Sequence, residues 1–200
     1  MMGATVAFWF DFASTYSYLS AMRIENEAAK HGVAVDWRPF LLGPIFARQG
    51  WTTSPFNIYP AKGRYMVRDI ERLAQARGLA FGMPQRFPAN SLLAARLATI
   101  GRAEGWAAAF SRAVFEAQFA RGEDIADEAV LGAALAAAGL DAAAVLARAS
   151  DAAVKEALKA ETTEAEQLGI FGAPTFVTAD GELFWGDDRL EQALEWARGR

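Results

Sequence analysis

The chain contains no cysteine and a single histidine among its 200 residues. Without cysteine the protein forms no disulfide and no thiolate of its own, which excludes thiol–disulfide exchange by its side chains. The same shortage excludes zinc and iron sites built from cysteine or several histidines, and we expect no metal site. His31 stands near the expected end of the first helix, where a histidine commonly interacts with the last carbonyls, so we assign it a structural role.

Long apolar runs and an excess of positive charge are also missing. No apolar stretch approaches the length of about 18 residues that a bilayer requires, and no basic region with a long apolar stretch opens the chain. We therefore expect a soluble, cytoplasmic protein without membrane contact. The net charge of −4 argues against nucleic acid as the main partner, since phosphate-binding proteins usually carry a basic face.

The hydrophobic content of 53% is enough for one full core. Residues 6–12 are apolar or aromatic except for Asp11, which predicts a buried strand. An amphipathic helix is expected over residues 16–30, ended by Gly32, and a second strand over residues 33–41, stopped near Pro39. A crossover of this length joins parallel neighbours, so these elements predict a β-α-β unit.

The middle of the chain is predicted to be helical. Residues 42–59 are typical of a loop, and a helix is expected over residues 60–77. Three arginines recur at every fourth position of that helix and are expected to form a solvated face rather than an anion site: Arg64, Arg68 and Arg72. Residues 90–168 are rich in helix formers, and Asn90 is expected to cap a helix that starts at Ser91.

The sheet resumes near the end of the chain. Residues 174–178 and 182–185 flank an Asp-Gly turn, which predicts a hairpin, and a last helix follows it. The order β-α-β, helices, then β-β-α describes an α/β protein with a thioredoxin-like fold and an all-helical domain inserted in its middle. The expected domains are residues 1–60 with 169–200 for the thioredoxin-like part and 61–168 for the insertion.

Ser14 stands at the turn between the first strand and the first helix. A serine there commonly caps the helix, which is worth about 1 kcal/mol and needs no function. A helix start also offers unpaired N–H groups that hold an anion or a thiolate. Both interpretations fit the residues alone.

Four motifs resemble those of one enzyme family. Residues 11–18 (DFASTYSY) are similar to D-F-x-S-P-[YF]-S-[YF], and residues 60–66 to P-x-K-G-x-Y-M. Residues 169–175 and 185–189 are similar to V-F-G-V-P-T and W-G-[NS]-D-R. The motifs resemble the 2-hydroxychromene-2-carboxylate isomerases and the kappa-class glutathione transferases, relatives of DsbA-type oxidoreductases. Thr15 stands where the family usually has proline.

The resemblance implies that the missing thiol comes from bound glutathione. Ser14 is the implied catalytic residue, whose hydroxyl would hydrogen-bond the glutathione sulfur, and Ala173, before a cis-proline, would pair with the cysteinyl backbone. Four further residues match the segment that binds the γ-glutamyl end: Trp185, Gly186, Asp187 and Asp188. Asp188 suits the ammonium group. Asp187 is alternatively a plain N-cap, and Lys62 and Asn90 match substrate-side positions.

The implied reaction is an isomerisation of 2-hydroxychromene-2-carboxylate to trans-o-hydroxybenzylidenepyruvate, or of a related aromatic substrate. The glutathione thiolate would add to the substrate, open its ring and leave after a bond rotation. One alternative is glutathione transfer or peroxide reduction, as in the kappa class. Another is a non-catalytic thioredoxin-fold module that binds peptides along the Pro174 edge. A homodimer is also expected from the resemblance.

Overall fold

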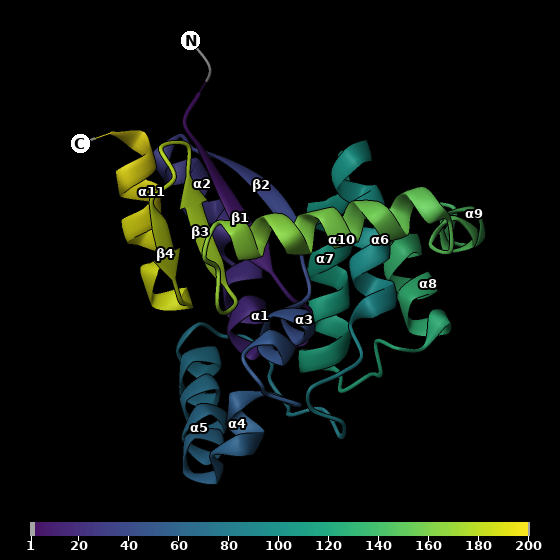
Figure 1. Ribbon diagram of the computed structural model, residues 1–200, viewed down its shortest axis with the longest axis horizontal. Helices are drawn as coiled ribbons and strands as arrows, with labels where there is room; N and C mark the ends of the chain where they lie inside the picture. Colours follow the sequence, from purple (N-terminus) through teal and green to yellow (C-terminus); the bar gives the residue numbers. More distant parts are fainter. Residues whose placement is uncertain (1–2, 200) are drawn as a thin grey trace.

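The computed structural model describes residues 3–199 and has a mixed sheet of four strands at its centre (Figure 1). The strands are β1 (Thr5–Phe10), β2 (Ala34–Pro39), β3 (Thr175–Thr178) and β4 (Leu183–Trp185). Their order is β2-β1-β3-β4. β1 runs parallel to β2 and antiparallel to β3, which pairs antiparallel with β4. The predicted β-α-β unit and the C-terminal hairpin are confirmed.

Helices make up most of the remaining chain. They are α1 (Thr15–Ala21), α2 (Ile24–His31), α3 (Leu42–Arg48), α4 (Pro55–Ile58), α5 (Pro60–Ala76), α6 (Leu92–Glu104), α7 (Ala107–Phe115), α8 (Glu128–Ala137), α9 (Ala142–Arg148), α10 (Ala152–Gln167) and α11 (Leu190–Arg198). A π-helical turn (Glu116–Ala120) extends α7, and a 3₁₀ turn (Asp187–Arg189) precedes α11. Within residues 3–199, no helix is long and apolar enough to cross a membrane.

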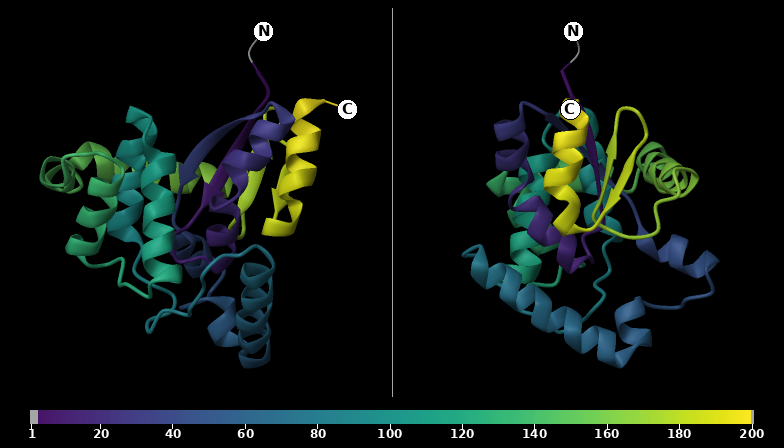
Figure 2. Two further views of the ribbon diagram at one scale, coloured as in Figure 1. Left: turned by 180° about the vertical axis from the view of Figure 1, so that it is seen from behind. Right: turned by 90° about the vertical axis from the view of Figure 1, so that its left-hand side faces the viewer.

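The sheet separates two hydrophobic clusters because successive side chains of β1 point to opposite faces. Phe8 and Phe10 belong to the larger cluster, with residues of α1, α2, α5–α9 and α11. Trp9 belongs to the smaller cluster, beneath α3 and α10. Figure 2 shows α11 and α10 on opposite sides of the sheet. A thioredoxin-like fold with inserted helices is confirmed, while the domain boundaries stay a prediction.

The first helix is divided, contrary to the prediction of one helix over residues 16–30. α1 ends at Ala21 and α2 starts at Ile24. Neither Gly nor Pro marks the division. It lies where Ser20 and Arg23 bind Asp187, which is 167 and 164 residues away. Tertiary contacts therefore accompany a break that local sequence does not signal.

Residues 42–59 contain two short helices, α3 and α4, where a loop was predicted. Pro44 lies in the first turn of α3, where proline is tolerated because its missing N–H has no partner there. The N–H of Leu42, the first residue of α3, donates to the buried carboxylate of Asp11 at 2.8 Å. A distant acceptor thus satisfies a donor that local residues leave free.

Figure 1 shows α4 and α5 side by side below the sheet, with the segment after α5 leading back toward α6. α5 covers nearly the whole predicted span 60–77. α6 begins at Leu92, one residue later than expected. The side-chain oxygen of Asn90 accepts from the Leu92 N–H at 3.2 Å, so Asn90 does bond to the start of this helix.

Candidate functional site

Ser14 lies between β1 and α1 and is the N-cap of α1. Its Oγ accepts a hydrogen bond from the N–H of Ser17 at 3.1 Å, as a capping serine does. The same hydroxyl donates to the carbonyl oxygen of Ala173 at 2.9 Å. Capping and a contact across the site are therefore combined in one half-buried side chain.

The Ala173–Pro174 peptide bond is cis and lies directly before β3. The carbonyl of Pro174 accepts from the N–H of Gly186 at 3.0 Å, and Trp185 pairs with Thr175 in the sheet. These contacts bring the segments around residues 14, 173 and 185 to one edge of the fold. Most residues of the predicted glutathione set therefore lie near one another.

An exposed aromatic pair borders this edge. The rings of Phe171 and Trp185 lie 4.9 Å apart, and the two residues are 47% and 50% exposed. Gly172 permits the close approach, because a Cβ atom there would lie 2.4 Å from Nε1 of Trp185. The sequence analysis did not single out Phe171. Such an exposed pair is a suitable surface for an organic ligand.

Asp188 is available to a ligand. Its side chain is 73% exposed, and its carboxylate lies 3.2 Å from the guanidinium of Arg189. Gly186 lies two residues before Asp188 and has a φ of 109°. A Cβ atom at residue 186 would lie 2.6 Å from the Asp188 carboxylate. The backbone and the space at residue 186 therefore both favour glycine.

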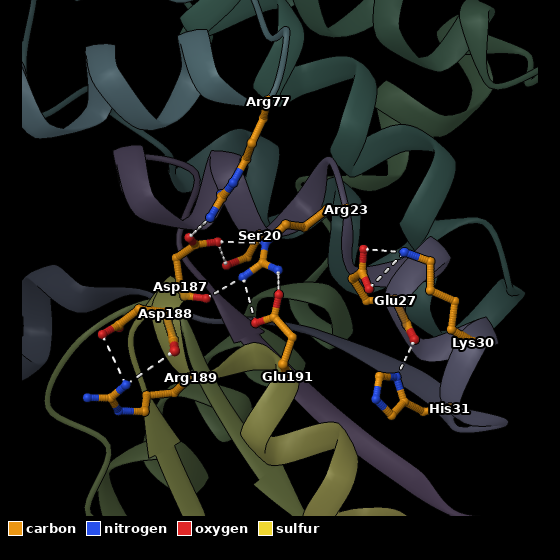
Figure 3. Close-up of polar contacts among 10 residues, drawn as sticks. All are labelled: Ser20, Arg23, Glu27, Lys30, His31, Arg77, Asp187, Asp188, Arg189 and Glu191. Carbon is orange, nitrogen blue, oxygen red and sulfur yellow. Dashed lines mark hydrogen bonds and ion pairs between the residues drawn. The ribbon is translucent and has the colours of Figure 1, made fainter.

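Asp187 is buried instead, at 3% exposure, and its carboxylate contacts three donors (Figure 3). One oxygen accepts from Ser20 Oγ at 2.9 Å and from Nε of Arg23 at 3.2 Å. The other accepts from the guanidinium of Arg77 at 2.7 Å. Arg23 also pairs with Glu191 of α11. The network joins α1, the start of α2, the end of α5 and the segment before α11.

This placement corrects the interpretation of Asp187 as an N-cap. Its side chain does not cap the following helix, and its carboxylate is fully engaged with protein donors. The Asp187 carboxylate is therefore not free for a ligand, and the role of Asp187 in glutathione binding stays a prediction. Arg23 and Arg77 were not predicted from the sequence, because their pairings with Asp187 span 164 and 110 residues and leave no local signal.

Asp11 is a second buried carboxylate, located under the Ser14 turn. It accepts from the N–H of Ala13 at 2.9 Å, the N–H of Leu42 at 2.8 Å and Ser91 Oγ at 2.8 Å. Burial raises the pKa of Asp11 above its usual value of 3.8, although these three hydrogen bonds oppose the shift. Asp11 therefore ties the turn to the starts of α3 and α6.

α5 is held against the first turn of α1. The hydroxyl of Thr15 donates to the sulfur of Met66 at 3.4 Å, and the phenol of Tyr16 donates to Asp69 at 2.9 Å. Burial, followed by the bond to Asp69, raises the pKa of Tyr16, so this phenol stays protonated at neutral pH. Thr15, which replaces the family's proline, is thus a buried contact to α5.

The remaining predicted residues lie elsewhere. The ammonium of Lys62 sits 5.7 Å from the ring centre of Phe56, and Asn90 bonds to the start of α6. Neither has a hydrogen bond or ion pair to the Ser14 edge in the described part of the chain. Nδ1 of His31 lies 2.8 Å from the carbonyl of Glu27, which agrees with a structural role (Figure 3). No metal-binding group of three or more His, Asp or Glu residues occurs within residues 3–199.

The donors and acceptors at this edge fit glutathione. The Ser14 hydroxyl is a donor suited to sulfur, and the exposed Asp188 carboxylate suits an ammonium group. The start of α1 adds backbone N–H groups that favour negative charge. Ser14 and Ser17 stand at the two positions where the DsbA-type C-x-x-C motif has cysteine, so this chain offers no thiol of its own there.

Comparison with known proteins gives full-length matches. The family model of the DSBA-like thioredoxin domain matches residues 5–195. A 2-hydroxychromene-2-carboxylate isomerase of Pseudomonas putida is 33% identical, with 98% of this chain and 94% of that protein covered. One of Sphingobium xenophagum is 30% identical, with 95% and 96% covered. Glutathione S-transferase kappa 2 of Caenorhabditis elegans is 27% identical, with 96% and 90% covered.

A solved structure of a 2-hydroxychromene-2-carboxylate isomerase superposes with a TM-score of 0.87 at 30% identity, covering 98% of this chain and 95% of that one. The expectation of an enzyme of the isomerase class is confirmed by these relatives. The chain belongs to the 2-hydroxychromene-2-carboxylate isomerase family, on the DSBA-like thioredoxin fold.

Proposed function

We propose that the protein is a glutathione-dependent isomerase of 2-hydroxychromene-2-carboxylate or a related aromatic substrate. The observation that carries the proposal is the Ser14 hydroxyl, which caps α1 and contacts Ala173 at an edge bordered by exposed aromatic rings. Bound glutathione would supply the thiolate nucleophile. The Ser14 hydroxyl would donate a hydrogen bond to the sulfur, Ala173 would pair with the peptide backbone, and Asp188 would bind the ammonium group.

A free thiol with a pKa of about 8.5 is only a few per cent ionised at neutral pH. Lowering that pKa by about two units stabilises the thiolate by roughly 2.7 kcal/mol. A hydrogen bond from the Ser14 hydroxyl and the partial positive charge at the start of α1 can together supply a stabilisation of this magnitude. Ser14 is unsuited to direct nucleophilic attack, because its hydroxyl has carbonyl and N–H partners and no general base.

The test follows glutathione-dependent conversion of 2-hydroxychromene-2-carboxylate by ultraviolet absorbance, together with thermal melts. Glutathione at a hundred times its dissociation constant should add about 2.7 kcal/mol of stability. Conversion without glutathione, or no conversion and no shift in melting temperature, would refute the proposal. We also propose a cytoplasmic location, where reduced glutathione is abundant, and a homodimer, which light scattering can check.

Glutathione transfer or peroxide reduction is the second candidate, favoured by the relative named glutathione S-transferase kappa 2. Chlorodinitrobenzene and hydroperoxide assays distinguish it, since a strict isomerase should be nearly silent in both. Substantial turnover in these assays, without isomerisation, would select the transferase.

A further inference from the structure

A hollow of about 560 Å³ lies between α4, α5 and the segment that follows α5. Phe56 and Asn57 of α4, Pro60, Gly63, Arg64, Met66 and Val67 of α5, and Met83 and Phe87 line it. The volume is within the range of small-molecule sites, about 300–1,000 Å³. Its wall is predominantly apolar, with one cationic side chain, Arg64.

The hollow adjoins the first turn of α1. Met66 accepts a hydrogen bond from Thr15, the residue after Ser14. The rings of Phe56 and Tyr16 have centres 6.5 Å apart. Two side chains of the wall therefore contact residues that immediately follow Ser14.

Arg64 differs from the other two arginines of its stripe on α5. Arg68 pairs with Glu71 at 3.0 Å and Arg72 with Asp69 at 3.1 Å, as expected for a solvated face. Among the described residues, Arg64 has no hydrogen-bond or ion-pair partner. Its guanidinium is thus a free bidentate donor at an apolar hollow.

The other polar side chain of the wall is already engaged. The side-chain NH₂ of Asn57 donates to the carbonyl of Phe87 at 3.2 Å and to Thr53 Oγ1 at 3.0 Å. These bonds hold α4 against the segment containing Phe87. Arg64 is consequently the one charged side chain of the wall, and the Lys62 ammonium lies beside the hollow, 5.7 Å from the ring centre of Phe56.

We infer that this hollow receives the second substrate and that Arg64 selects for an aromatic carboxylate. The ring would pack among Phe56, Val67 and Phe87, and the carboxylate would form a bidentate pair with Arg64. The inference rests on the proposed function, because it assigns the aromatic substrate to a place beside the Ser14 turn. It adds Arg64 to the substrate-side candidates Lys62 and Asn90, which are not themselves part of the wall.

Calorimetric titration with trans-cinnamate and its neutral amide, without glutathione, tests the inference. Wild type should bind cinnamate more tightly than the amide. Arg64→Gln should weaken cinnamate binding about tenfold or more and leave the amide unchanged. Arg64→Lys should restore part of the loss. The control is Arg68→Gln, which removes the same charge from the same helix and should change neither ligand.

Val67→Trp should abolish binding of both cinnamate and its amide, because the larger side chain fills the hollow. Equal losses in Arg64→Gln and Arg68→Gln, or equal wild-type affinity for acid and amide, would overturn the inference. Glutathione titration separates it from the proposed function. Arg64→Gln should bind glutathione like wild type. If wild type is a glutathione-dependent isomerase and Arg64→Gln binds cinnamate as tightly as wild type, only the role of Arg64 is refuted. Absent glutathione binding in wild type refutes the proposed function instead.

Discussion

The hydroxyl of Ser14 donates to the carbonyl oxygen of Ala173 at 2.9 Å. A hydroxyl has a single proton to donate, so a thiolate at this edge must compete with the Ala173 carbonyl for it. The bond that Ser14 accepts from the Ser17 N–H uses a lone pair and can persist. The hydrogen bond from the Ser17 N–H can therefore hold Ser14 in place while its O–H reorients from the Ala173 carbonyl to the sulfur of a bound thiolate.

Replacing Ser14 by alanine should lower the glutathione-dependent kcat/KM about 10- to 100-fold, because a hydrogen bond to a charged group is worth roughly 1.5–3 kcal/mol. The free energy of unfolding should fall by about 1 kcal/mol through loss of the cap. Steady-state kinetics and urea unfolding measure the two effects. Ser17→Ala is the matched control, since the buried Ser17 hydroxyl has no partner in the described chain. Equal loss in both variants would contradict the role of Ser14.

Asp188→Asn should raise the dissociation constant of glutathione about two- to fivefold, because an exposed ion pair contributes up to about 1 kcal/mol. The free energy of unfolding should stay the same, since this side chain is 73% exposed and its one ion pair within residues 3–199 is with the exposed Arg189. Calorimetric titration and urea unfolding check both statements. Unaltered glutathione affinity would remove Asp188 from the site.

Asp187→Asn should instead reduce the free energy of unfolding by at most about 3–5 kcal/mol, because it leaves Arg77 without a counter-charge and Arg23 with Glu191 alone. The double variant Asp187→Asn, Arg77→Met should lose less than the sum of the single variants, since both act on one pair. Urea unfolding of the three variants measures the coupling. Strict additivity would mean that the Arg77 pair contributes little.

The raised pKa of Asp11 predicts a particular pH dependence of stability. Above pH 3.8 the unfolded chain loses the Asp11 proton first, while the folded protein retains it until the raised pKa is passed. The folded state then binds more protons, so the Asp11 contribution to stability falls with rising pH in this window and is constant above it. Below pH 3.8 both states are protonated, so the Asp11 contribution is fully present there and does not depend on pH.

Urea unfolding of wild type and Asp11→Asn from acid to neutral pH tests this dependence. The stability of the variant relative to wild type should increase through the window, by at most about 1.4 kcal/mol per pH unit. Rearranged hydrogen bonds to Ala13 and Leu42 add an offset that does not depend on pH. A difference that stays flat, or falls as pH rises, would contradict the raised pKa.

Much of the fold follows from local patterns. The apolar run before Ser14 predicts β1, the Asp180-Gly181 turn predicts the hairpin, and the helix from Pro60 is predicted nearly to its end. Strand alternation, turn residues and helix-ending glycines act over a few residues, so they can be read along the chain. The division between α1 and α2 and the start of α3 coincide with hydrogen bonds to Asp187 and Asp11, far away in sequence.

The sequence by itself determined that the chain has no thiol of its own, because it contains no cysteine, and that Ser14 stands at the turn before the first helix. Only the tertiary structure decided which neighbouring acid faces a ligand: Asp187 is buried among distant arginines, whereas Asp188 is exposed. It also decided that Arg64 alone of its stripe lacks a carboxylate partner among the described residues. Adjacent or evenly spaced residues look alike along a chain, and burial and pairing, set by contacts across the fold, make them different.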